Sequence, residues 1–185
     1  MISRGFFRLK PLGITVGSVD SARGFGVTGV TDSTGVTYNN FALPWPGLWT
    51  IAAVGGAGGG GGYSSSFFRN GAAGSPAALV TPTVTLGRRP ITVKVGAGGA
   101  AGANGASASA GSTGNSSSVS GDGTNIASGG FGGAAGASGT THNPTPAASN
   151  WPYGSTTAGQ GGRGGTDTLT PLAGQAGAVR LKLVG

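Results

Sequence analysis

The stretch that decides the fold is Val54-Gly55-Gly56-Ala57-Gly58-Gly59-Gly60-Gly61-Gly62, which directly follows the apolar run Leu48-Trp49-Thr50-Ile51-Ala52-Ala53. The stretch has almost no side chains to bury, and glycine loses more backbone freedom on ordering than any other residue. It is therefore either a flexible spacer or a segment ordered by packing of backbone against backbone. The same succession of strand and glycine recurs at Val95-Gly96, which favours the ordered alternative.

The composition excludes several classes of protein. At 185 residues the chain has the size of one domain, yet it contains 42 Gly and only 8% charged residues, against about 25% in ordinary soluble domains. Its acids are four Asp and no Glu, which disfavours the paired carboxylates of a glycosidase or a catalytic triad. With Cys 0 the chain has no disulfide framework and no cysteine-based metal site. We expect a protein that is not an enzyme and that uses no cofactor and no metal.

The charge and hydropathy patterns limit the partners. The net charge of +7 comes from scattered bases, and Arg88-Arg89 is the one adjacent pair, so no basic block for nucleic acid is present. No apolar window of about 18 residues could span a membrane. The first eight residues, MISRGFFR, lack the long apolar region of a signal peptide, which predicts a soluble protein made in a cytoplasm.

Four apolar stretches predict a small antiparallel β scaffold without α-helix. In residues 48–54 Trp49 and Ile51 fall on one face. Residues 80–86 and 91–95 alternate on either side of Gly87-Arg88-Arg89-Pro90, which we interpret as the turn of an antiparallel hairpin. In residues 179–183, Val179, Leu181 and Leu183 face inward while Arg180 and Lys182 face water.

Glycine-rich tracts lie between these strands, at residues 55–62, 96–105, 129–139, 159–165 and 174–177. Two of them follow a predicted strand directly, and the last leads into one. Chains of this composition can adopt a three-residue-per-turn extended helix without internal hydrogen bonds. Such polyglycine-II helices can bond to one another through their backbones. We therefore predict a mostly β protein whose strands carry packed polyglycine-II helices and long glycine-rich loops.

Residues 1–40 differ from the rest, because apolar and aromatic residues alternate there with single glycines, a pattern typical of short strands and turns. We interpret residues 1–40 as a β-rich docking or adaptor segment and residues 41–185 as the glycine-rich domain. The alternative is that residues 1–40 supply the first strands of that same domain.

Polar and aromatic side chains gather in two loops, residues 63–70 and 140–153. Loops on a rigid scaffold commonly carry binding residues, and aromatic rings suit sugars and apolar pockets. The candidate contact residues are Phe67, Phe68, Arg69, His142, Asn143, Asn150, Trp151 and Tyr153. For the aromatic ones the alternative is structural, as plugs of the bundle ends or of a subunit contact. His142, the one His, has no partners for a triad or a metal site, and the glycine patterns that resemble nucleotide-binding motifs are expected by chance in this composition.

Four segments carry a resemblance to a known family: LWTIAAVGGAGGGGGY, ITVKVGAGGAAG, GNSSSVSGDGTNIASGGFGGAAG and GQAGAVRLKLVG. Taken in order over residues 41–185, they resemble the glycine-rich domain of many bacteriophage tail-tip and tail-fibre proteins. A similar pattern occurs in the glycine-rich ectodomain of certain animal receptor tyrosine kinases. The resemblance implies a β scaffold with packed polyglycine-II helices, whose connecting loops contact the host receptor in phage adhesins. The stretch from Ala100 to Ser120 departs from the pattern, because Ala and Ser dilute its glycines.

The resemblance leads to an expected function. We expect a structural protein of a phage tail tip or fibre, made in the host cytoplasm and assembled into the virion. Residues 1–40 would dock to other tail proteins, and the loops would bind a host-surface glycan or an outer-membrane protein. By analogy the chain would form a homo-oligomer, as a trimer or a ring. The alternative is a virion decoration or capping protein without a receptor role.

Overall fold

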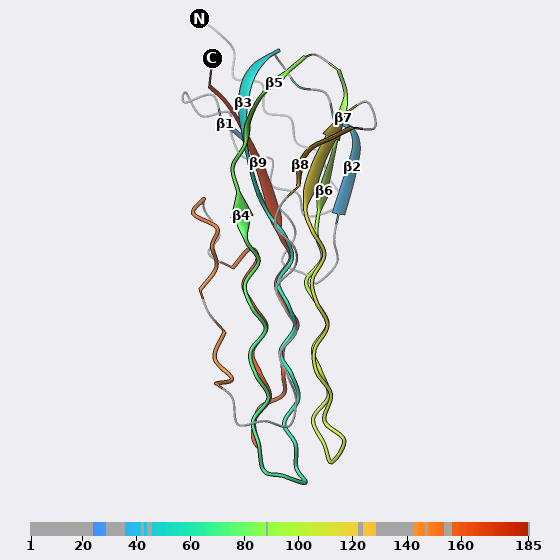
Figure 1. Cartoon of the computed structure of the whole chain (residues 1–185), viewed down its shortest axis with the longest axis vertical. Helices are drawn as coiled ribbons and strands as arrows, with labels where there is room; N and C mark the ends of the chain where they lie inside the picture. The colour runs from blue at the N-terminus through green and yellow to red at the C-terminus, as the bar shows by residue number, and fades with distance from the viewer. Residues whose placement is uncertain are drawn as a thin grey trace, which may run out of the picture.

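A computed structural model describes residues 24–28, 36–41, 43, 46–87, 89–121, 124–128, 143–146, 148–153 and 157–184. This part is elongated, with β-strands at one end and long extended segments running side by side toward the other (Figure 1). No α-helix occurs among the described residues, which confirms the predicted mostly β class. The described part accordingly holds no helix that could cross a membrane.

The strands of the described residues form two antiparallel sheets. The first sheet contains β1 (Gly24–Thr28), β9 (Ala178–Leu183), β3 (Gly47–Val54), β4 (Leu79–Val80) and β5 (Thr83–Leu86). In it, β3 pairs with β9 along one edge and with β4 and β5 along the other. The second sheet contains, in this order, β2 (Val36–Phe41), β6 (Ile91–Val95), β7 (Ser118–Gly121) and β8 (Thr124–Ser128).

The main core lies between the two sheets. Trp49 and Ile51 of β3 and Leu181 of β9 pack there with Val93 and Val95 of β6, and all five are buried. The predicted inward faces of residues 48–54 and 179–183 are therefore confirmed. Both β1 and β2 pair within these sheets, with β9 and β6 respectively, while the docking role of residues 1–40 stays a prediction.

The predicted hairpin between residues 80–86 and 91–95 is wrong. β5 pairs with β3 in the first sheet, whereas β6 pairs with β2 and β7 in the second. The chain between β5 and β6 thus crosses from one sheet to the other. Two strands that face each other across a core show the same alternation of apolar residues as two strands that pair in a hairpin, so periodicity alone could not distinguish them.

Below the sheets, residues 55–62 form the central tract of a bundle. Their N–H groups bond to three neighbouring tracts in rotation: Gly56 and Gly59 donate to Asn115 and Ser112, while Ala57 donates to Gln175 and Gly58 to Ser75. The next N–H groups repeat this order, since Gly60, Gly61 and Gly62 donate to Leu172, Ala72 and Ser109. A repeat of three residues with bonds only between tracts is the pattern of polyglycine II. The opening glycine stretch is therefore an ordered element and not a spacer.

Two further tracts donate hydrogen bonds to the central one. Gly99 and Gly102 bond to the carbonyls of Ala57 and Gly60, and Gly162 and Gly165 bond to those of Gly58 and Gly61. Five described tracts therefore surround the central tract: residues 71–78, 96–104, 109–117, 159–165 and 171–177. The predicted tract at residues 129–139 lies outside the described residues.

Glycine is required where the tracts touch. A Cβ atom on Gly56 or Gly59 would overlap the carbonyl of Ala97 or Ala100, and one on Gly60 would overlap that of Arg163. At such positions the neighbouring backbone, and not a side chain that could move, occupies the space. This close approach explains why the central tract contains almost only glycine.

Alanine and serine supply members of the bundle that the glycine count did not reveal. Residues 109–117 form a full tract, and the hydroxyls of Ser109 and Ser112 accept hydrogen bonds from the N–H groups of Ala103 and Ala100. The dilution of glycine between Ala100 and Ser120 therefore does not prevent ordering, because small side chains fit on the outside of the bundle.

Candidate functional site

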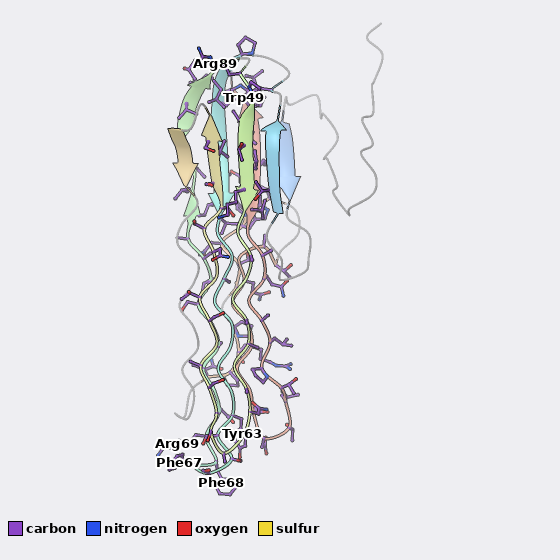
Figure 2. All side chains as sticks on the ribbon, turned by 90° about the vertical axis from the view of Figure 1, so that its right-hand side faces the viewer. Trp49, Tyr63, Phe67, Phe68, Arg69 and Arg89 are labelled. Carbon is purple, nitrogen blue, oxygen red and sulfur yellow. The ribbon has the colours of Figure 1, made fainter. Side chains whose placement is uncertain are left out.

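Among the described residues, three turns form the end of the bundle farthest from the sheets. They connect tract 55–62 to tract 71–78, tract 96–104 to tract 109–117, and tract 159–165 to tract 171–177. Figure 2 places Tyr63, Phe67, Phe68 and Arg69 of the first turn at this end, and Trp49 and Arg89 at the opposite end. The first turn therefore lies as far from the sheets as the bundle allows.

Residues 64–69, which we name the distal turn, are closed by backbone bonds. Ser64 and Arg69 each donate an N–H to the carbonyl of the other, at 2.9 and 3.1 Å. Phe68 has a φ of 52°, a left-handed conformation that is uncommon for a bulky residue. The side chains of Phe67 and Phe68 are 68% and 83% exposed. The turn thus holds two adjacent aromatic rings in water.

The neighbouring turn supports the distal turn from the side. Gly105 donates to the carbonyl of Tyr63 at 3.0 Å and accepts from the N–H of Ser65 at 3.1 Å. The hydroxyl of Ser66 donates to the carbonyl of Ala106 at 3.3 Å. These contacts join two segments about 40 residues apart in the chain, so the distal turn is held by its surroundings and not only by its own closure.

The other predicted contact residues lie elsewhere. Trp151 is only 5% exposed and packs with Ala52, Val54 and Ala178 on the outer face of the first sheet. The ring of Tyr153 meets that of Trp151 edge to face at 5.3 Å, and Arg180 of β9 lies 4.4 Å over the Tyr153 ring. This cluster covers the junction of sheet and bundle, where its rings contribute packing.

The two asparagines of the second predicted loop bond to tract 71–78. The side chain of Asn150 donates to the carbonyl of Ala77 at 2.8 Å, and the carbonyl of Asn143 accepts from the N–H of Ala73. The side-chain oxygen of Asn143 accepts from the N–H of Thr145. His142 lies outside the described residues.

The structure therefore separates Arg69 and the predicted aromatic residues into two groups. Phe67, Phe68 and Arg69 lie at the distal end, whereas Trp151 and Tyr153 pack beside the first sheet. Between Gly71, next to the distal turn, and Ala77, next to Trp151, a tract rising about 3.1 Å per residue spans roughly 20 Å. One ligand of small size cannot touch both groups.

The sequence did not reveal two features of the distal end. Leu169 is 43% exposed in the third turn, and its carbonyl accepts a hydrogen bond from the side chain of Asn104. Neither residue stands out in the sequence, because a lone Leu or Asn between glycines carries no periodic signal. Among the described residues, no group of three or more His, Cys, Asp or Glu side chains is placed to hold a metal ion.

A family model described as a glycine-rich domain matches residues 31–182 of the chain. The chain belongs to this glycine-rich domain family. The match includes β2 and the six tracts that the structure describes, and it begins within the segment that we interpreted as a separate docking region. No curated protein matches the chain significantly.

Proposed function

We propose that this glycine-rich domain protein is a rigid adhesion module of a bacteriophage tail tip or fibre, and that its distal turn contacts the host surface. The observation that carries the proposal is the exposure of Phe67 and Phe68 at the end of the rod (Figure 2). The assignment to a phage tail is supported by the resemblance of residues 41–185 to tail proteins. In this proposal residues 1–40 dock to other tail proteins, and the partner is a host-surface glycan or an outer-membrane protein.

The size of the contact implies several copies. Burying one Phe side chain completely contributes about 1.5–3 kcal/mol, so the two rings supply roughly 3–6 kcal/mol. Association itself costs about 4–15 kcal/mol of lost translational and rotational freedom. One turn would therefore bind weakly, and a trimer or ring that presents several turns together would bind through multivalency.

A structural role without receptor binding is the competing function. Residues 95–121 contain no charged residue, and many of their small side chains are exposed on the side of the bundle. A surface of this kind suits lateral packing against neighbouring subunits, as in a decoration or capping protein. The two functions differ in what the distal turn does, so the turn is the place to test them.

The test is adsorption of the purified protein to host cells, for the wild type and for Phe67→Ala, Phe68→Ala and the double variant. We expect the double variant to lose at least tenfold in apparent affinity, because about 1.4 kcal/mol corresponds to tenfold and the two rings contribute more. Both side chains are exposed, so the variants should fold normally.

Thr85→Ala is the matched control, since Thr85 is exposed on β5 near the opposite end of the molecule. Its adsorption should equal that of the wild type. Equal adsorption of the wild type and the double Phe variant would contradict a binding role of the distal turn and favour the structural role.

A further inference from the structure

The side chain of Asn104 lies where the three turns at the far end of the bundle come together. Its Oδ1 accepts the N–H of Tyr63 at 2.7 Å, and its Nδ2 donates to the carbonyl of Leu169 at 3.2 Å. Asn104 itself stands at the end of tract 96–104. One amide group therefore bonds to the residue before the distal turn and to a residue in the third turn.

The bond to Tyr63 replaces a tract-to-tract bond at the place where the bundle ends. The N–H groups of the central tract find partners on neighbouring tracts as far as Gly62, which donates to Ser109. The next N–H, of Tyr63, bonds to the side-chain oxygen of Asn104 and not to a backbone carbonyl of a neighbouring tract. The amide oxygen thus terminates the central tract, as a capping residue terminates an α-helix.

The surroundings of Asn104 are shaped for this arrangement. A Cβ atom on Gly165 would overlap the Oδ1 atom of Asn104, so glycine at this position leaves room for the amide. The carbonyl of Leu169 also accepts the N–H of Thr166, and the Thr166 hydroxyl accepts the N–H groups of Thr168 and Leu169. The third turn is therefore a closed unit to which the amide nitrogen is attached.

We propose that Asn104 is a positioning residue for the distal turn, which fixes the direction in which Phe67 and Phe68 face the partner. The inference rests on the proposed function, and it adds the residue that aims the contact surface without touching the partner. Without the Asn104 side chain, Tyr63 loses the hydrogen bond that ends the central tract. The bonds between Ser64 and Arg69 that close the distal turn remain. The rings then stay exposed but sample more directions, which weakens binding through the entropy of ordering.

Asn104→Ala and Asn104→Asp separate the two bonds of the amide. The readouts on the full chain are chymotrypsin cleavage after Phe67 and Phe68, located by mass spectrometry, amide exchange at Thr166, the melting temperature, and adsorption to host cells. For Asn104→Ala we expect cleavage to rise about tenfold and adsorption to fall about threefold, with Thr166 exchanging faster and an unchanged melting temperature. Asn104→Asp keeps the acceptor for Tyr63 and loses the donor to Leu169. Its cleavage should stay near the wild-type rate while Thr166 exchanges faster.

Asn115→Ala is the matched control, because Asn115 is an exposed asparagine of the same bundle that bonds to its described neighbours through its backbone N–H and C=O. If Asn104→Ala is cleaved and adsorbs like the wild type while the double Phe variant adsorbs less, the positioning role of Asn104 is overturned and the proposed function stands. A lower melting temperature of Asn104→Ala would also overturn the positioning role, since destabilisation of the whole protein would then account for the faster cleavage. Faster cleavage in Asn104→Ala with normal adsorption of the double Phe variant would overturn the proposed function and leave Asn104 as the residue that holds the turn.

Discussion

Ser117 connects the strands to the bundle through a single hydroxyl group. This serine is fully buried, at 0% exposure, just before β7. Its Oγ donates to the carbonyl of Val54 at 2.7 Å and accepts the N–H of Gly96 at 2.9 Å. Val54 ends β3 and Gly96 begins a tract, so three segments meet at this hydroxyl.

We expect Ser117→Ala to lower the free energy of unfolding by about 2 kcal/mol, because it leaves a buried N–H and a buried C=O without their partner. Urea unfolding followed by tryptophan fluorescence measures the change. Ser107→Ala, at an exposed serine of the second turn, should shift the free energy by less than about 0.5 kcal/mol. Equal stability of the two variants would mean that water replaces the Ser117 hydroxyl.

Single residues also show where sequence-based prediction ends. The burial of Trp49, Ile51 and Leu181 could be predicted, because the alternation of apolar and polar residues within each strand indicates which face is buried. Phe67 and Phe68 could be placed in a loop, and they are exposed there. The burial of Trp151 and the bonds of Asn104 could not be predicted, since they depend on segments far away in the chain that the fold brings together.

At the scale of elements, the tracts depend on where glycine stands and not on how much glycine they contain. Gly59 faces the backbone of a neighbouring tract, and an added Cβ would overlap the carbonyl of Ala100. At Gly87, between β5 and β6, an added Cβ would have no described residue within 4 Å apart from its chain neighbours. A count of glycines treats these two positions as equal, whereas the packing requires glycine at Gly59 and leaves room for a side chain at Gly87.

We therefore expect opposite outcomes from the same substitution at the two positions. Gly59→Ala should destabilise the protein by about 3 kcal/mol or more, because backbone on the neighbouring tract cannot move aside without breaking its own hydrogen bonds. In a chain of this size that loss corresponds to a drop of about 10 °C in melting temperature. Gly87→Ala should change it by no more than about 2 °C. Calorimetry measures both, and similar melting temperatures would contradict close packing of the central tract.

The same dependence on position explains the tract that the sequence did not reveal. Gly111 and Gly114 are the two glycines of residues 109–117, and both face the central tract. A Cβ on Gly111 or Gly114 would overlap the carbonyl of Gly59 or Gly56. Ser109 and Ser112 lie outside and bond to the next tract. A three-residue spacing of glycine is sufficient on the outside of the bundle, and such a spacing is a weak signal in a chain so rich in glycine.

At the scale of the whole molecule, the bundle has little stability of its own. Ordering the backbone costs about 1–2 kcal/mol per residue, while one internal hydrogen bond returns about 0.5–1.5 kcal/mol net. Residues 55–62 add almost no apolar side chain to this balance, which leaves it near zero or unfavourable. The sheets must supply the difference, and they are suited to do so because β3 and β6 continue directly into tracts while β7 and β9 continue directly from them.

This balance predicts that a substitution that destabilises the core between the sheets also destabilises the bundle. Leu181→Ala should cost about 2–5 kcal/mol, because it leaves a cavity among Ile51, Val93 and the other core residues. Native-state amide exchange should then show the same loss of protection at Gly59 in the bundle as at Val93 in the second sheet. Lys182→Ala, at the exposed neighbour of Leu181, should leave both amides unchanged. If Leu181→Ala lowered the protection of Val93 and left that of Gly59 intact, the sheets and the bundle would unfold separately, and the rod would owe its rigidity to the tracts alone.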